Sequence, residues 1–126
     1  MGAAGGWGWV AVGAVGCAVA VGAGAFGAHA LQSRLDARSL QLWETAARYL
    51  VYGALGLVLL GLAAQQAPAA GFGRAGWALA AGTAVFAGTV MALALGGPRW
   101  LGAVTPLGGT LMILGFLLFA WAALRA

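Results

Sequence analysis

Charged side chains are scarce in this sequence of 126 residues, and lysine is absent from it altogether. Two acidic residues and six arginines supply all the charge, so only 6% of the chain is charged. A soluble domain typically carries about a quarter of its residues as charged side chains. A surface with so little charge is poorly solvated by water, and the sequence therefore predicts that a lipid bilayer surrounds most of the protein.

Reactive side chains are equally few, because His29 is the only histidine and Cys17 the only cysteine. A single cysteine excludes an internal disulfide, and no group of residues has the spacing of a metal site. A Ser–His–Asp set, paired catalytic carboxylates, a phosphate-binding loop and a CxxC motif are all missing. We therefore expect no metal, no cofactor and no enzymatic activity.

The net charge of +4 comes from arginines that are scattered along the chain. A protein that binds nucleic acid usually gathers its basic residues into a patch or a stripe. One or two arginines in each predicted loop are more typical of side chains that anchor at anionic lipid headgroups. We expect the lipid bilayer as the partner of these arginines, and no nucleic acid.

Long apolar runs are what the sequence has in abundance, since 63% of its residues are hydrophobic. A bilayer core of roughly 30 Å needs about 20 helical residues to cross, and four segments are long enough. The alternating pattern of a transmembrane β-barrel does not occur. The predicted fold is an all-α integral membrane four-helix bundle in a single domain, residues 1–126. Its spans cover about residues 7–31, 43–64, 75–97 and 101–124.

The six tryptophans agree with this division into spans, because indole rings favour the boundary between hydrocarbon and water. Each lies near the end of a predicted span: Trp7, Trp9, Trp43, Trp77, Trp100 and Trp121. Four crossings place both termini on the same side of a cytoplasmic (inner) membrane. Counting arginines puts the first and third loops in the cytoplasm, by a margin of only one or two charges.

The segment 32–42 between the first two spans is amphipathic instead of apolar. Leu31, Leu35 and Leu42 share one face, and the other face is covered by Gln32, Arg34, Asp36 and Arg38. Ser33 followed by Asp36 matches a capping box, in which both side chains bind free N–H groups at a helix start. We predict a short interfacial helix here, leading into the second span.

Glycine is enriched where helices pack against each other in lipid, and the chain has 23 glycines. Small residues let two helix backbones approach closely. The predicted packing positions include Gly16 and Gly24, which belong to a stripe with four-residue spacing on the first helix. Gly88 on the third helix and the pair Gly108 and Gly109 on the fourth complete the set. Such faces serve contacts within one chain or, alternatively, the seam of a homo-oligomer or a larger membrane complex.

The best candidate for a polar or ligand site is the group His29, Glu44 and Arg48. His29 is about 15 Å from the middle of the first span at 1.5 Å per residue, which places it at the hydrocarbon boundary. Glu44 and Arg48 are four residues apart with the acid first, the favourable order for an ion pair on a helix. As alternatives, His29 is an ordinary polar residue at a helix end, and Glu44 and Arg48 form an ion pair at the membrane interface.

The stretch TPLGG, residues 105–109, contains the only proline that falls inside a predicted span. Proline removes a backbone donor, so a carbonyl is left to find another partner in lipid. Proline in the first turn of a helix is ordinary. The sequence therefore predicts a helix start just below Trp100, with a broken helix that lines a cavity as the alternative.

Landmarks along nearly the whole chain resemble a known family. They are GAFGAHAL at 24–31, Trp43-x-Thr45-Ala46 with Tyr49, Phe86-x-Gly88, Leu93-x-Leu95, Leu101-Gly102 and Thr105-Pro106-x-Gly108-Gly109. In this order they resemble domain-of-unknown-function family 423, small bacterial four-helix membrane proteins to which eukaryotic transmembrane protein 256 is similar. The resemblance implies architecture and location, and it transfers no reaction.

The chain departs from that family pattern at several polar positions. Leu50 and Gly53 stand where the pattern has a glutamine and a histidine. A serine-rich stretch followed by a tyrosine is replaced by Phe86-Ala87-Gly88-Thr89 with Met91. An activity that depended on the second-helix histidine would therefore be in doubt in this chain.

Few reactive groups and many packing surfaces favour a non-enzymatic role. We expect a scaffold or accessory subunit that docks through its Gly/Ala helix faces. The alternative is a small transporter or ion pathway that uses the polar group at one membrane face as a gate. Because almost no polar side chain lies near the middle of a span, the ion pathway is the less favoured of the two.

Overall fold

The computed structural model describes residues 5–126 and is built from four long helices. They are α1 (Gly5–His29), α2 (Ala37–Gln66), α3 (Gly73–Ala94) and α4 (Leu101–Arg125), with a one-turn 3-10 helix, η1 (Pro68–Ala70), between α2 and α3. All four long helices are long and apolar enough to cross a membrane. The predicted all-α membrane four-helix architecture is confirmed, whereas the depth of each helix in a bilayer stays a prediction.

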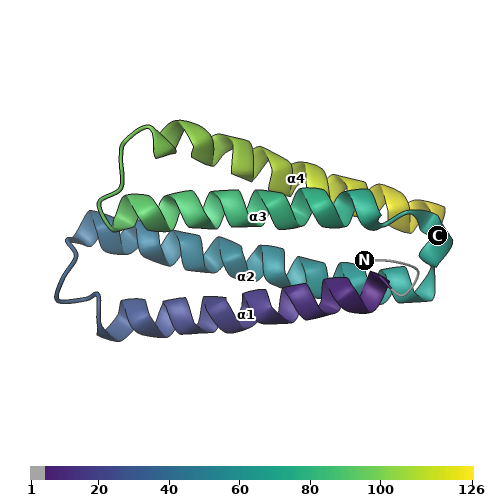
Figure 1. Cartoon of the computed structure of the whole chain (residues 1–126), viewed down its shortest axis with the longest axis horizontal. Helices are drawn as coiled ribbons and strands as arrows, with labels where there is room; N and C mark the ends of the chain where they lie inside the picture. Colours follow the sequence, from purple (N-terminus) through teal and green to yellow (C-terminus); the bar gives the residue numbers. More distant parts are fainter. Residues whose placement is uncertain (1–4) are drawn as a thin grey trace.

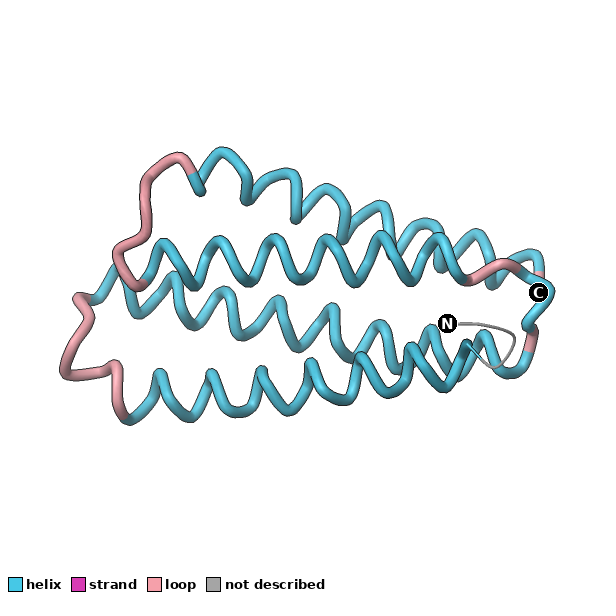
Figure 2. Tube along the Cα trace, viewed as in Figure 1, coloured by secondary structure: helices cyan, strands magenta, loops and turns pink. Residues whose placement is uncertain are grey.

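Neighbouring helices run antiparallel, so the connections fall at two ends of the molecule (Figure 1). The α1–α2 and α3–α4 connections share one end, which we call the His29 end. The α2–α3 connection lies at the other, which we call the Arg125 end (Figure 2). Helix α1 begins and α4 finishes at the Arg125 end, so the two termini of the helical part lie on the same side.

The helices pack mainly in chain order, α1 on α2, α2 on α3 and α3 on α4. Contacts between α2 and α4 are few, which leaves α1 and α4 as the outer helices of the arrangement. In the most apolar stretch of each, 44% of the α2 residues are buried but only 17% of those of α1. The molecule is therefore two helical hairpins joined through α2 and α3, with wide apolar faces left outside.

Within the first hairpin, the buried side of α1 consists of small residues seven positions apart. Gly6, Gly13, Ala20 and Gly27 are buried, and a Cβ added to Gly6 would lie 2.5 Å from the carbonyl oxygen of Gly61 on α2. A seven-residue repeat is the period at which two helices stay in contact by coiling gently round each other. The two backbones therefore touch along much of their length.

The second hairpin repeats the same arrangement with Gly108, Gly115 and Ala122 buried on α4. Facing them on α3 is Gly82, where an added Cβ would lie 2.5 Å from the backbone nitrogen of Met112. Nearer the His29 end the hydroxyls of Thr89 and Thr105 are 2.7 Å apart and share a hydrogen bond between the helices. Close backbones and one polar contact thus hold α3 to α4.

The five glycines expected to pack helices have two kinds of surroundings. Gly16 lies against Ala54, Gly108 against the backbone of Phe86, and Gly109 makes ordinary contact with the Phe86 ring. Around Gly24 and Gly88 a Cβ would find no atom within 4 Å. Any packing role of these two must therefore involve another molecule.

The connection between α1 and α2 is a series of turns, and the short interfacial helix is not confirmed. Residues 37–42 are the first residues of a continuous α2. Asp36 is the N-cap, and its carboxylate accepts a 2.8 Å hydrogen bond from the Ser39 backbone N–H. The helix begins later than a capping box at Ser33 predicts, because Asp36 itself binds the free N–H group.

Pro106 lies inside α4 instead of at its start, since the helix begins five residues earlier at Leu101. The carbonyl of Gly102, which would receive the missing N–H, is freed by the proline. Close by, the Thr105 hydroxyl donates to the Leu101 carbonyl at 3.0 Å, and the Thr110 hydroxyl donates to the Pro106 carbonyl at 2.8 Å. Helix α4 thus begins directly after Trp100, as predicted, and it is continuous through the proline, so the alternative of a broken helix is not observed.

The hairpin seams predict opposite effects for two glycines on the same helix. Gly82→Ala places a methyl group against the α4 backbone, and we expect it to reduce the free energy of unfolding by about 1–3 kcal/mol. Gly88→Ala meets open space, and it should be neutral or stabilising by up to about 1 kcal/mol because alanine favours a helix. Denaturant-induced unfolding in detergent, followed by circular dichroism, measures both. Equal losses in the two variants would contradict the seam.

Candidate functional site

The three residues of the predicted polar site lie at or near the His29 end, and all three side chains are exposed. His29 is the last residue of α1, and Glu44 and Arg48 lie in the first turns of α2. Within residues 5–126 no hydrogen bond or ion pair joins them. The polar cluster, and the ion pathway that would use it as a gate, stay predictions that a proteoliposome flux assay on His29→Ala can test.

Trp43 is the residue that organises this end, and the sequence alone did not reveal its role. Its ring is buried against Gly27, where an added Cβ would lie 2.6 Å from a ring carbon. Its Nε1 donates a 2.8 Å hydrogen bond to the Ala23 carbonyl. Trp43 therefore ties the last turns of α1 to α2, with its ring packed between the two helices.

The Trp9 side chain is also buried inside the helical bundle. Its ring is buried on Gly76 of α3 and meets Trp77 edge to face, with ring centroids 5.2 Å apart. This contact brings the start of α1 to α3, across the hairpin boundary. The other four tryptophans are exposed, as side chains at a lipid interface would be.

Gly53, one of the positions where the resemblance implies a polar residue, lies between α2 and α3. A side chain at Gly53 would collide with Thr83, whose hydroxyl is buried without a hydrogen-bond partner among the described residues. No side chain larger than glycine fits at position 53 while Thr83 keeps its place. The absence of a side chain at Gly53 thus allows α2 and α3 to pack closely at this point.

An apolar groove of about 380 Å³ runs between α2 and α4 with α3 behind it. Tyr49 and Tyr52 line it from α2, Phe86 from α3, and Pro106 and Phe116 from α4. The groove exists because α2 and α4 scarcely touch. Its aromatic and aliphatic lining suits hydrocarbon, and the polar side chains among its lining residues are Tyr49, Tyr52 and Thr110.

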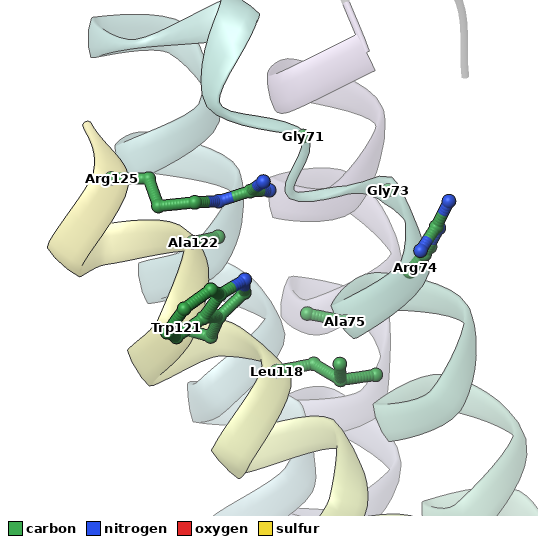
Figure 3. Close-up of a pocket in the computed structure, with 8 residues that line it drawn as sticks. All are labelled: Gly71, Gly73, Arg74, Ala75, Leu118, Trp121, Ala122 and Arg125. Carbon is green, nitrogen blue, oxygen red and sulfur yellow. The ribbon is translucent and has the colours of Figure 1, made fainter.

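A second cavity, of about 430 Å³, lies at the Arg125 end and is lined in part by charged side chains (Figure 3). Arg74, near the start of α3, and Arg125, the last residue of α4, both line it. One guanidinium nitrogen of Arg125, Nη2, donates a 3.0 Å hydrogen bond to the Ala70 carbonyl. The guanidinium carbon lies 5.8 Å from the centroid of the Trp121 ring, within the range of a cation–π contact.

The residues that line this cavity come from distant parts of the chain, so the sequence alone did not predict it. Arg74 and Arg125 are far apart in the chain, and only the antiparallel packing of α3 and α4 brings them to one space. The floor is apolar, formed by Ala75, Leu118 and Ala122. We take this arginine cavity as the candidate functional site. No group of three metal-binding side chains occurs among residues 5–126.

Comparison with known proteins shows the family to which the chain belongs. The model of a family described as a protein of unknown function, DUF423, matches residues 23–109. The chain belongs to the DUF423 family. The matched stretch runs from the last turns of α1 through the TPLGG segment, so it includes the His29 end and the part of the groove up to Gly109.

Relatives of this DUF423 protein share its length as well as its sequence. A UPF0382 membrane protein of Staphylococcus epidermidis is 40% identical over 117 residues, which cover 93% of this chain and 95% of that relative. The UPF0382 membrane protein YwdK of Bacillus subtilis is 36% identical over 118 residues, 93% and 96% of the two chains. Both names agree with four membrane-spanning helices. No solved structure matches the chain significantly.

The cap at the His29 end predicts a pH dependence. The Ser39 backbone N–H, with smaller contributions from the Ser39 side chain and Arg38, lowers the pKa of Asp36 below its usual value. A carboxylate with a lowered pKa in the folded state stabilises above its unfolded pKa, and this stabilisation is lost as the pH falls through the folded value. Asp36→Ala should therefore melt below the wild type at neutral pH, with a deficit that shrinks in acid.

Thermal melting of both proteins in detergent between pH 7 and pH 3 measures this deficit. Asp36→Asn is the matched control, because asparagine still accepts the hydrogen bond but carries no charge. We expect its melting temperature to respond less to acid than that of the wild type. A deficit for Asp36→Ala that is constant over the whole pH range would show that the charge of the cap is irrelevant.

Proposed function

We propose that this DUF423 protein is a non-enzymatic scaffold or accessory subunit that docks on other membrane helices through small residues. The observation that carries the proposal is a face of α1 directed away from α2. Its exposed small residues are Ala11, Ala14, Ala18, Gly22 and Ala25, with the exposed Val15 among them. We call this surface the outer face of α1.

In a lipid bilayer, such a face can bind another helix. Hydrocarbon tails are as apolar as the helices, so helices associate in a bilayer mainly through close packing. Alanine and glycine permit that closeness, as the contact of Gly6 with Gly61 shows inside this chain. A Cβ at Gly22 would find no atom within 4 Å. The outer face of α1 thus carries small residues, as the inner seams do, and Gly22 on it meets no other part of the chain within residues 5–126.

We take the occupant of this face to be a second copy of the chain. A two-fold axis along the membrane normal would bring the same face of a second α1 to the same depth, in a self-complementary contact. The α1–α2 seam already places Gly6 against Gly61 and Gly16 against Ala54. Because α1 is the least buried of the four helices in its apolar stretch, a second copy would cover the widest uncovered surface.

One substitution on the outer face of α1 tests this docking. Ala18→Leu adds bulk outside the chain's own packing, so the fold should be retained while the second copy is held away. We expect the dissociation constant of the dimer to rise about tenfold, as a loss of 1–2 kcal/mol would give. Sedimentation equilibrium in density-matched detergent measures it. Ala81→Leu, at an exposed position on α3, makes the same change elsewhere and should leave the constant unaltered.

Cross-linking in native membranes provides a second measurement. In a Cys17→Ser background, Ala18→Cys should form disulfide-linked dimers under mild oxidation, and Ala81→Cys should not. A wild-type protein that stays monomeric at every protein-to-detergent ratio would overturn the docking proposal. Equal weakening by the two leucine variants would do so as well.

A further inference from the structure

We propose that the arginine cavity at the Arg125 end binds a phosphate group, carried by a phospholipid or present as a free anion. This inference concerns a different face of the molecule from the outer face of α1, and it does not depend on dimer formation. It rests on the charges that line the cavity, on the position of the acidic residues, and on the apolar walls beneath the charges.

Two guanidinium groups from different helices line one space of about 430 Å³. Arg125 donates one hydrogen bond to the Ala70 carbonyl, and a guanidinium has five N–H donors in all. Arg74 makes no hydrogen bond with the rest of the described chain. Most of the donors of the two side chains are therefore available to a ligand, and they are charged donors of the kind that bind phosphate best.

No acidic side chain of the protein can neutralise this pair. The chain has only two acidic residues, and both are distant. Asp36 caps the start of α2 at the His29 end, and Glu44 follows within its first turns. Helix α2 runs the length of the molecule between these residues and the cavity (Figure 1). Two positive charges thus face one cavity without a carboxylate side chain, and an anion from outside is the complementary ligand.

The shape of the cavity favours an amphiphilic source for that anion. Figure 3 shows Arg125 reaching across from α4 toward the Gly71 loop, with Arg74 on the α3 side, and Leu118 and Ala75 further down the helices. Trp121, on the same wall, is exposed, as an indole at the headgroup boundary is. A phosphate between the guanidinium groups would leave the apolar part of a lipid along Leu118 and Trp121.

The arginines at the His29 end provide the matched comparison. Arg34 and Arg99 carry the same charge in connections at that end, which also holds Asp36 and Glu44. A double variant with Arg34→Gln and Arg99→Gln removes as much positive charge as one with Arg74→Gln and Arg125→Gln. General attraction of anions to a basic protein would suffer equally in both, whereas a phosphate site would be lost only in the second.

The test is the melting temperature of the purified full chain in neutral detergent, titrated with three probes. Dioctanoyl phosphatidic acid carries phosphate and acyl chains, dioctanoylglycerol carries the chains alone, and inorganic phosphate is the free anion. A ligand that binds the folded state raises the melting temperature with its concentration. We expect phosphatidic acid to stabilise the wild type and the Arg34/Arg99 variant. The Arg74/Arg125 variant should need about tenfold more of it for the same shift.

Two further variants separate binding from folding. Arg74→Gln alone removes a side chain that makes no hydrogen bond within the described chain, so it should weaken binding without altering the helical circular dichroism. Replacement of both arginines by lysine keeps the charge and should restore part of the affinity. Stabilisation by inorganic phosphate would identify the free anion as a ligand too, and stabilisation by phosphatidic acid alone would identify the headgroup.

The proposal is overturned if dioctanoylglycerol stabilises the wild type as strongly as phosphatidic acid does. It is also overturned if the Arg34/Arg99 variant loses as much affinity as the Arg74/Arg125 variant. Because dimer formation is measured on Ala18→Leu, which leaves both arginines in place, failure of one proposal can be told from failure of the other.

Discussion

Direct contact between helix backbones is the interaction on which the rest of the structure depends. At Gly6 on α1 and Gly82 on α3, an added Cβ would lie 2.5 Å from a backbone atom of the neighbouring helix. In a bilayer no hydrophobic force drives helices together, so the gain comes from van der Waals contact over long, smooth faces. The same closeness brings Thr89 to Thr105 and places two distant arginines around one cavity.

The all-α fold and the four helices could be predicted because they follow from composition and from the length of apolar runs. The stripe of packing residues was harder, since small residues occur on every side of α1. A four-residue spacing through Gly16 and Gly24 was as visible in the sequence as the seven-residue spacing through Gly6 and Gly13. Only the position of α2 decides between them, and that position results from the whole packing arrangement.

Trp43 and the arginine cavity show a different limit. A tryptophan near the end of a span reads as a belt residue, and nothing local indicates that Gly27 leaves a space for its ring. Arg74 and Arg125 are each ordinary flanking residues, and their meeting depends on the antiparallel hairpin of α3 and α4. Sequence periodicity describes one helix at a time, so contacts between helices lie beyond it.

The division into two hairpins also bears on how the chain is made. The seam of α1 with α2 uses no residue beyond Gln66, so the first half of the molecule can assemble while the second half is still being synthesised. Each hairpin joins two helices that are consecutive in the chain, so it can close its own seam before the two halves meet at α2 and α3. Biogenesis would then proceed by insertion of successive helix pairs, with the burial of Trp9 against Gly76 as a late event.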